Sequence, residues 1–137
     1  MQIIIYSPGD RPKGAEKELL EGYLKRISRR LKAEVIYSNP KNLLESDFVI
    51  VLDEDGTKLD NQSFADKFDG ITCSGRYKRV VFVIGEAYGA SDAIKKRADF
   101  IWSFSGQVFP HRLFRIMLTE QIYRTLEIIA GSPYHHS

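Results

Sequence analysis

Cysteine is almost absent from this sequence of 137 residues, and the single Cys73 excludes an intrachain disulfide. Long apolar runs are missing as well. The longest are residues 3–6, 48–52 and 80–84, far short of the roughly 20 residues that cross a membrane. No basic stretch followed by a long apolar one opens the chain, so no signal peptide is predicted. These absences favour a cytoplasmic protein that makes no membrane contact.

The composition is that of a globular protein: 43% of the residues are hydrophobic and 28% are charged, which excludes global disorder. The length fits one domain, spanning residues 1–137. The net charge of +2 is unevenly distributed, because residues 11–34 carry eight basic and four acidic side chains, whereas residues 40–70 carry three and eight. A basic surface beside an acidic one could orient a polyanion. A solvated helix face explains residues 11–34 equally well.

Strands alternate with helices along the whole chain. Apolar runs predict strands, and three- and four-residue spacing predicts helices. We expect strands at residues 2–6, 33–37, 48–52, 80–84 and 99–104, with a turn at 53–56. Helices are expected at residues 14–31, 61–68 with an extension towards 71, a short stretch capped by Ser91, and 111–129. The alternation predicts an α/β domain whose mostly parallel sheet is flanked by helices.

Two loops that follow strands are candidates for a ligand site. Residues 85–89 contain two glycines after a strand, but they match neither a dinucleotide fingerprint nor a P-loop, so a plain turn remains an alternative. Residues 103–110 combine serines, a glycine and apolar side chains, which offer free backbone groups and apolar walls. The alternative for this second segment is a connecting loop whose aromatic rings belong to the core.

The last helix has apolar residues on more than one face, which predicts a homodimer that packs through it. Arg115, Gln121 and Arg124 could line a site or simply face solvent. The tail ends in two histidines, His135 and His136, which lack a third ligand and make a poor zinc site, so no metal is predicted.

The motifs together resemble the RlmH family. They are residues 82–91 (FVIGEAYGAS), residues 103–105 with 109–115, residues 120–124 with Gly131 and 133–136, and residues 51–53 with Gly56. RlmH proteins are SPOUT-class methyltransferases. They use S-adenosylmethionine to methylate N3 of a pseudouridine in large-subunit (23S) ribosomal RNA. The resemblance implies a SPOUT-type α/β-knot with a C-terminal trefoil knot, which sequence patterns alone would not suggest.

The resemblance also assigns residues. The donor S-adenosylmethionine is expected at Leu52, Gly85, Phe104, Ser105, Gly106, Gln107, Val108 and Phe109. His111 is the candidate general base, with a structural histidine as the alternative, and Arg115 could hold a phosphate or pair with a carboxylate of its own chain. Ribosomal RNA, as part of the ribosome, is the expected partner and is assigned to Arg124, Tyr134, His135 and His136.

Two features depart from the family pattern. Glu86 stands where the family usually has glycine, and a lysine-rich helix is missing around residues 39–46. The first adds charge near the donor, and the second removes positive surface. Two other functions therefore stay open. One is a SPOUT methyltransferase acting on another RNA such as tRNA, and the other is a ribosome-binding or assembly protein of the same fold with little catalysis.

Overall fold

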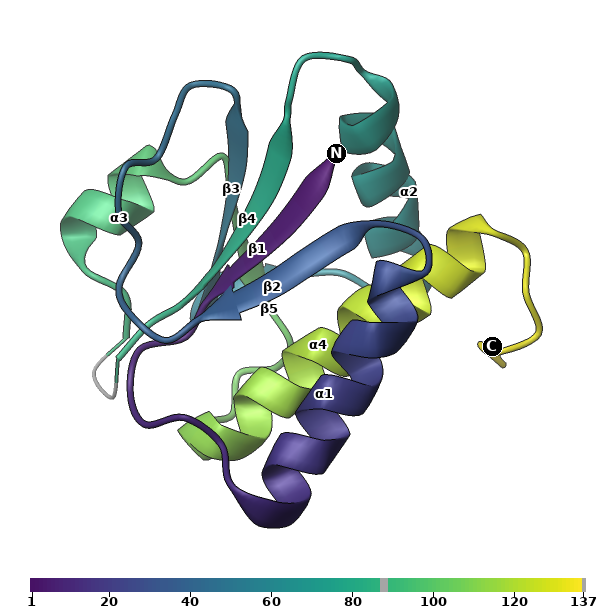
Figure 1. Ribbon diagram of the computed structural model, residues 1–137. Helices are drawn as coiled ribbons and strands as arrows, with labels where there is room; N and C mark the ends of the chain where they lie inside the picture. Colours follow the sequence, from purple (N-terminus) through teal and green to yellow (C-terminus); the bar gives the residue numbers. More distant parts are fainter. Residues whose placement is uncertain (87–88, 137) are drawn as a thin grey trace.

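Five strands form one sheet (Figure 1). The computed structural model describes residues 1–86 and 89–136. Across the sheet the strands follow the order β2-β1-β4-β3-β5. Their bounds are β1 Gln2–Tyr6, β2 Lys32–Ile36, β3 Asp47–Lys58, β4 Arg79–Ile84 and β5 Phe100–Ser103. Every pair of neighbouring strands runs parallel, which confirms the predicted α/β fold with a parallel sheet.

Helices cover both faces of the sheet. The helices are α1 Gly14–Ser28, α2 Asn61–Cys73, α3 Asp92–Arg97 and α4 His111–Ile129. α1, α2 and α4 pack on one face, and α3 packs on the other (Figure 1). In β1, Ile3 and Ile5 face the first group while Ile4 faces α3. Because both faces are covered, the strands are apolar at successive positions, which is why they are visible in the sequence as short continuous runs.

The structure corrects several predicted boundaries. The expected turn at residues 53–56 lies inside β3, because Thr57 and Lys58 pair again with Trp102 and Ser103 of β5. α1 ends at Ser28 rather than at residue 31, and α2 continues to Cys73. The bounds of α4 agree with the prediction, and Ser91 caps α3 by accepting a hydrogen bond from the Ile94 amide at 3.3 Å.

Parallel strands bring all their carboxyl ends to one edge of the sheet. Residues 52–55 of β3 and the segments that follow β4 and β5 therefore lie near one another, and α4 starts directly beyond the last of these segments. Between β2 and β3 the chain crosses in residues 37–46 without a helix. Within the described residues, none of the helices is long and apolar enough to cross a membrane.

Candidate functional site

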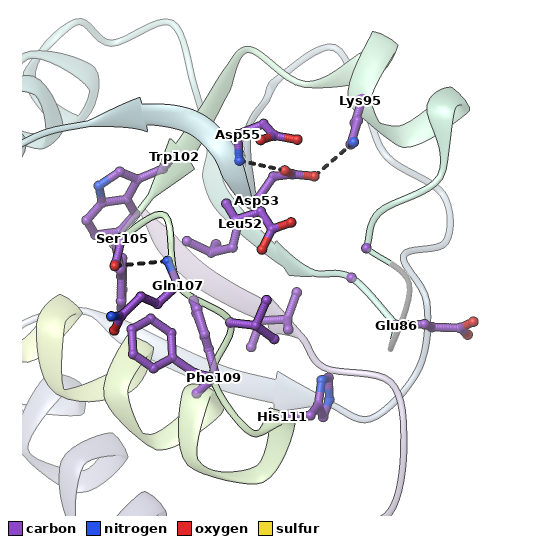
Figure 2. A pocket seen from close by; sticks show the side chains of 17 residues that line it. Leu52, Asp53, Asp55, Glu86, Lys95, Trp102, Ser105, Gln107, Phe109 and His111 are labelled. Atoms are coloured by element: carbon purple, nitrogen blue, oxygen red, sulfur yellow. Dashed lines mark hydrogen bonds and ion pairs between the residues drawn. The ribbon is translucent and has the colours of Figure 1, made fainter.

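A cavity of about 520 Å³ opens at the carboxyl edge of the sheet (Figure 2). Three segments surround it: residues 52–55 of β3, the residues that follow β4, and the loop between β5 and α4. Its lining includes Leu52, Gly85, Phe104, Ser105, Gln107, Val108 and Phe109, which are seven of the eight residues predicted to hold the donor. The eighth, Gly106, is exposed and is absent from the lining, and a Cβ atom added to it would lie 3.7 Å from Lys58 Nζ.

Close backbone contact shapes the wall after β4. A Cβ atom added to Gly85 would lie 2.4 Å from the Ala90 nitrogen, so the position has no room for a side chain. Gly89 takes a φ of +89°, which favours glycine, and its amide donates to the Glu86 carbonyl at 2.8 Å. The two predicted loop residues between them, Ala87 and Tyr88, lie outside the described residues.

Serine hydroxyls hold the loop after β5. The single hydroxyl hydrogen of Ser103 is shared between two carbonyl oxygens, those of Glu54 and Ser105, which lie 3.1 and 2.9 Å from Oγ and tie the loop to β3. Ser105 Oγ accepts from the Gln107 amide at 3.1 Å. The Phe104 ring stacks on Phe114 of α4 with centroids 4.9 Å apart. The loop thus joins an ordered backbone to an aromatic wall.

Acidic side chains in the lining were missed by the sequence analysis. Asp53, Glu54 and Asp55 all line the cavity, together with Lys95. Asp53 accepts from the Asp55 amide at 2.9 Å and pairs with Lys95 Nζ at 2.9 Å (Figure 2). Burial raises the pKa of Asp53, but these two partners outweigh it and lower the pKa, so the carboxylate stays ionised. The available signal was their position, directly after the buried run 48–52.

His111, the first residue of α4, also lines the cavity (Figure 2). Its Nε2 lies 2.7 Å from the Pro8 carbonyl oxygen and 3.4 Å from Ser7 Oγ. Because a carbonyl oxygen only accepts, Nε2 carries the proton, and Nδ1 keeps the lone pair in the neutral ring. Burial lowers the His111 pKa, the Pro8 contact opposes this, and the positive charge of Arg115 adds to the lowering. The ring is therefore neutral at pH 7.

Arg115 lies one turn further along α4, is 1% exposed, and is not part of the cavity lining. Its Nη1 donates to the Asp10 carbonyl at 2.6 Å, and its guanidinium lies 5.2 Å from the Tyr37 ring centroid. Burial is the main cause that lowers its pKa. Arg115 and His111 together bind the backbone of residues 8–10, the segment that follows β1.

The tail residues predicted to bind RNA gather on the far half of α4. Arg124 pairs with Glu120 at 2.7 Å, and its Nη1 lies 3.0 Å from His135 Nδ1. Tyr134 OH donates to Glu120 at 3.1 Å; burial first, and then this carboxylate, raise the pKa of Tyr134 to about 12. His136 is exposed, and none of the four lines the cavity. Among residues 1–86 and 89–136, no three His, Cys, Asp or Glu side chains lie together as a metal site.

The two departures from the RlmH pattern meet in space. Asn39, in the short connection between β2 and β3, donates from Nδ2 to Glu86 Oε1 at 3.0 Å. Figure 2 shows the Glu86 carboxylate projecting away from the other labelled side chains. Glu86 borders the cavity but is exposed to solvent. The added negative charge is thus held towards the 39–46 segment.

The chain matches the family described as "Predicted SPOUT methyltransferase" over residues 1–135. It is 42% identical to the ribosomal RNA large subunit methyltransferase H of Caldicellulosiruptor saccharolyticus, over 87% of this chain and 90% of that protein. The protein of the same name from Chelativorans sp. is 34% identical over 98% of this chain and 91% of that protein. Among solved structures, the SpoU methyltransferase AviRb from Streptomyces viridochromogenes, in complex with AdoMet, is similar with a TM-score of 0.47 and 11% sequence identity. The match covers 92% of this chain and 57% of that one. This similarity is too weak to transfer site residues. The family match covers residues 1–135, and the two methyltransferase H alignments extend over nearly the whole of both proteins. The chain therefore belongs to the SPOUT methyltransferases, in the RlmH family.

Proposed function

We propose that this protein transfers a methyl group from S-adenosylmethionine to N3 of a pseudouridine in the RNA of the large ribosomal subunit. The observation that carries the proposal is the cavity at the carboxyl edge of the sheet, around which seven of the eight predicted donor-binding residues lie. Membership of the RlmH family, with relatives named for ribosomal RNA methylation, supports the choice of substrate.

The residues of the cavity suit the donor. Its volume of about 520 Å³ lies in the range of small-molecule sites. Leu52, Phe104 and Phe109 offer apolar walls for an adenine ring, and the backbone of residues 104–109 offers hydrogen-bonding groups. The acidic lining residues Asp53, Glu54 and Asp55 outnumber Lys95, so the lining would favour a positively charged sulfonium.

When bound, S-adenosylmethionine supplies an electrophilic methyl group. The chain has to hold the attacking nitrogen in line with that group and accept the proton that the nitrogen loses. His111 is the base in this proposal, because its Nδ1 carries the free lone pair while Nε2 is fixed by Pro8. Arg115 acts as a positioning residue: its hydrogen bond to Asp10 orders the segment that orients the His111 ring.

A homodimer through α4 is part of the proposal. Leu113, Met117, Gln121 and Ile128 follow one another at intervals of one or two helical turns and are exposed or half-buried, so they form a stripe that the described residues leave at least partly open. Arg124 and the tail residues Tyr134, His135 and His136 border this stripe in sequence. In a dimer they contact the RNA that the partner holds.

The trefoil knot also belongs to the proposal. Trp102 of β5 pairs with Leu52 and again with Thr57, and four residues separate the two partners. The β3–β5 pairing shifts its register between Leu52 and Thr57, so residues 53–56 leave the ladder and return to it at this point. The knot itself is what membership of the SPOUT methyltransferases implies. A Cβ atom at Gly56 would lie 2.7 Å from the Ile101 carbonyl oxygen, so the backbone of this segment passes directly against β5.

The test is a methylation assay with labelled S-adenosylmethionine on ribosomes and on bulk tRNA, both from cells that lack the gene, followed by identification of the labelled nucleoside by mass. Labelled methylpseudouridine in large-subunit RNA is the expected result. Label in tRNA alone would keep the enzyme class and refute the substrate. Without label in either RNA, calorimetry with the donor decides: an absence of binding would favour a ribosome-binding or assembly role.

A further inference from the structure

A second, smaller cleft lies between the end of α1 and the second half of α4, which run side by side (Figure 1). Its volume is about 250 Å³, and its lining is Arg26, Arg29, Arg30, Tyr123 and Glu127. Tyr123 follows His111 by 12 residues on α4, which at the helical rise is about 18 Å. The cleft is therefore separate from the donor cavity, and the proposed reaction makes no use of it.

The charges in this cleft are only partly neutralised. Arg30 Nε donates to Glu127 Oε2 at 2.6 Å, and Tyr123 OH donates to Glu127 Oε1 at 3.0 Å. Arg26 lies over the rings of Tyr23 and Tyr123, at 5.4 and 5.8 Å from their centroids. In the described part of the chain, no hydrogen bond or ion pair joins the guanidinium of Arg26 or of Arg29 to another protein group. Three positive charges thus face one negative charge.

The helix dipole does not account for this arrangement. A cation near a helix C-terminus interacts favourably with about half a negative charge, which gives a reason for one or two basic residues in the last turn of α1. It gives no reason for three arginines around one cleft, or for two tyrosine rings that hold Arg26. The cleft's net charge of about +2 exceeds the opposing charge of the helix end.

Resting on the proposed function, we propose that this arginine cleft binds phosphate groups of the RNA substrate's backbone, away from the reacting nucleotide. Guanidinium groups donate two parallel hydrogen bonds to one phosphate, which lysine cannot do. Glu127 keeps Arg30 in place, and the tyrosine rings limit the freedom of Arg26, so two of the three arginines are ordered before binding. A site of this kind adds affinity for RNA without reading its sequence.

The experiment compares the variant Arg26→Gln/Arg29→Gln with the control Lys13→Gln/Lys17→Gln. Both lose two positive charges, but Lys17 is nine residues before Arg26 and so lies on the opposite face of α1. Arg30 is kept because of its ion pair with Glu127. Binding of protein-free large-subunit RNA is measured against salt, together with methylation kinetics and donor binding for both variants.

For the cleft variant we expect the slope of log affinity against log salt to shrink by about 1.4, and affinity at 0.15 M salt to fall about tenfold. The KM for RNA should rise by the same factor, with kcat and donor affinity unchanged, and the control should change none of these by more than about twofold. Equal effects of both variants, or of neither, would overturn the site. A loss confined to intact large subunits would assign the cleft to a ribosomal protein and also overturn it. Failure of the wild-type chain to methylate large-subunit RNA in ribosomes would instead refute the proposed function.

Discussion

Replacing Gly85 by alanine tests whether the wall after β4 belongs to the donor site. The new Cβ would lie 2.4 Å from the Ala90 nitrogen and 2.5 Å from the Gly89 carbonyl carbon, whereas unstrained contacts are about 3.5 Å or longer. Both neighbours are backbone atoms, so the 89–90 segment has to move by about 1 Å. Gly85 and Gly89 both line the cavity, so this displacement moves part of the cavity wall.

The expected cost has two parts. Overpacking at this position lowers the free energy of unfolding by about 1–2 kcal/mol, because the loop is at the surface and can shift. For a chain of this length that corresponds to a fall in Tm of about 3–7 °C. The displaced wall loses at least one hydrogen bond or close contact to the donor, so Kd for S-adenosylmethionine should rise about tenfold or more.

Calorimetry with S-adenosylmethionine and thermal unfolding with and without it measure both parts. The matched control is Gly70→Ala in α2, where an added Cβ meets nothing within 4 Å. Inside a helix this change raises the free energy of unfolding by up to about 1 kcal/mol, and it should leave the donor Kd unaltered. A folded Gly85→Ala protein that binds the donor as tightly as the wild type would refute the assignment of this wall to the donor site.

Three further predictions concern other residues. Because burial lowers the His111 pKa, kcat of the wild type should fall only below pH 6.5. The variant His111→Asn should lose this fall of kcat at acidic pH, and its kcat should be about 10²- to 10⁴-fold lower. A variant that keeps the same fall of kcat at acidic pH would exclude His111 as the base. Glu86→Gly should change the donor Kd by no more than about twofold in calorimetry, since Asn39 holds the carboxylate; a larger change would mean that Glu86 faces the donor. Asp47 is buried and pairs with Arg79 at 2.7 Å, so Asp47→Asn should cost about 2–3 kcal/mol in urea unfolding at pH 7. Burial raises the pKa of Asp47, but the hydrogen bonds from Arg79 and from the Leu44 amide outweigh burial and lower this pKa. The stabilisation by the Asp47 carboxylate is therefore present above about pH 4 and is lost as the pH falls through the lowered pKa. A variant whose stability depends on acidic pH as strongly as that of the wild type would contradict this prediction.

Much of the fold could be predicted because the parallel strands are buried on both faces. The runs at residues 3–6, 48–52 and 80–84 therefore show the strands directly, and the alternation with helices gives the layers. The end of β3 could not be predicted, because residues 53–56 look like a turn and only the distant Trp102 keeps Thr57 in the sheet. Long-range pairing of this kind leaves no local signal.

The candidate site was predicted unevenly. The loop residues 104–109 came from resemblance, and all of them except Gly106 line the observed cavity. The acidic lining at residues 53–55 was overlooked, since the sequence alone presented it as a turn. The surroundings of Arg115 could not be foreseen, because its partners, the Asp10 carbonyl and the Tyr37 ring, come from segments far away in sequence.

The order of strands in the sheet has a consequence for the growing chain during synthesis. β1 and β3 are separated by β4, which is translated after both of them. Until residue 84 has emerged, a nascent chain exposes two apolar strands that have no shared neighbour, and α1 lacks α4, against which it packs. A fragment that stops before β4 should therefore be prone to aggregation, and this small protein gains its native structure only when nearly all of its chain has left the ribosome.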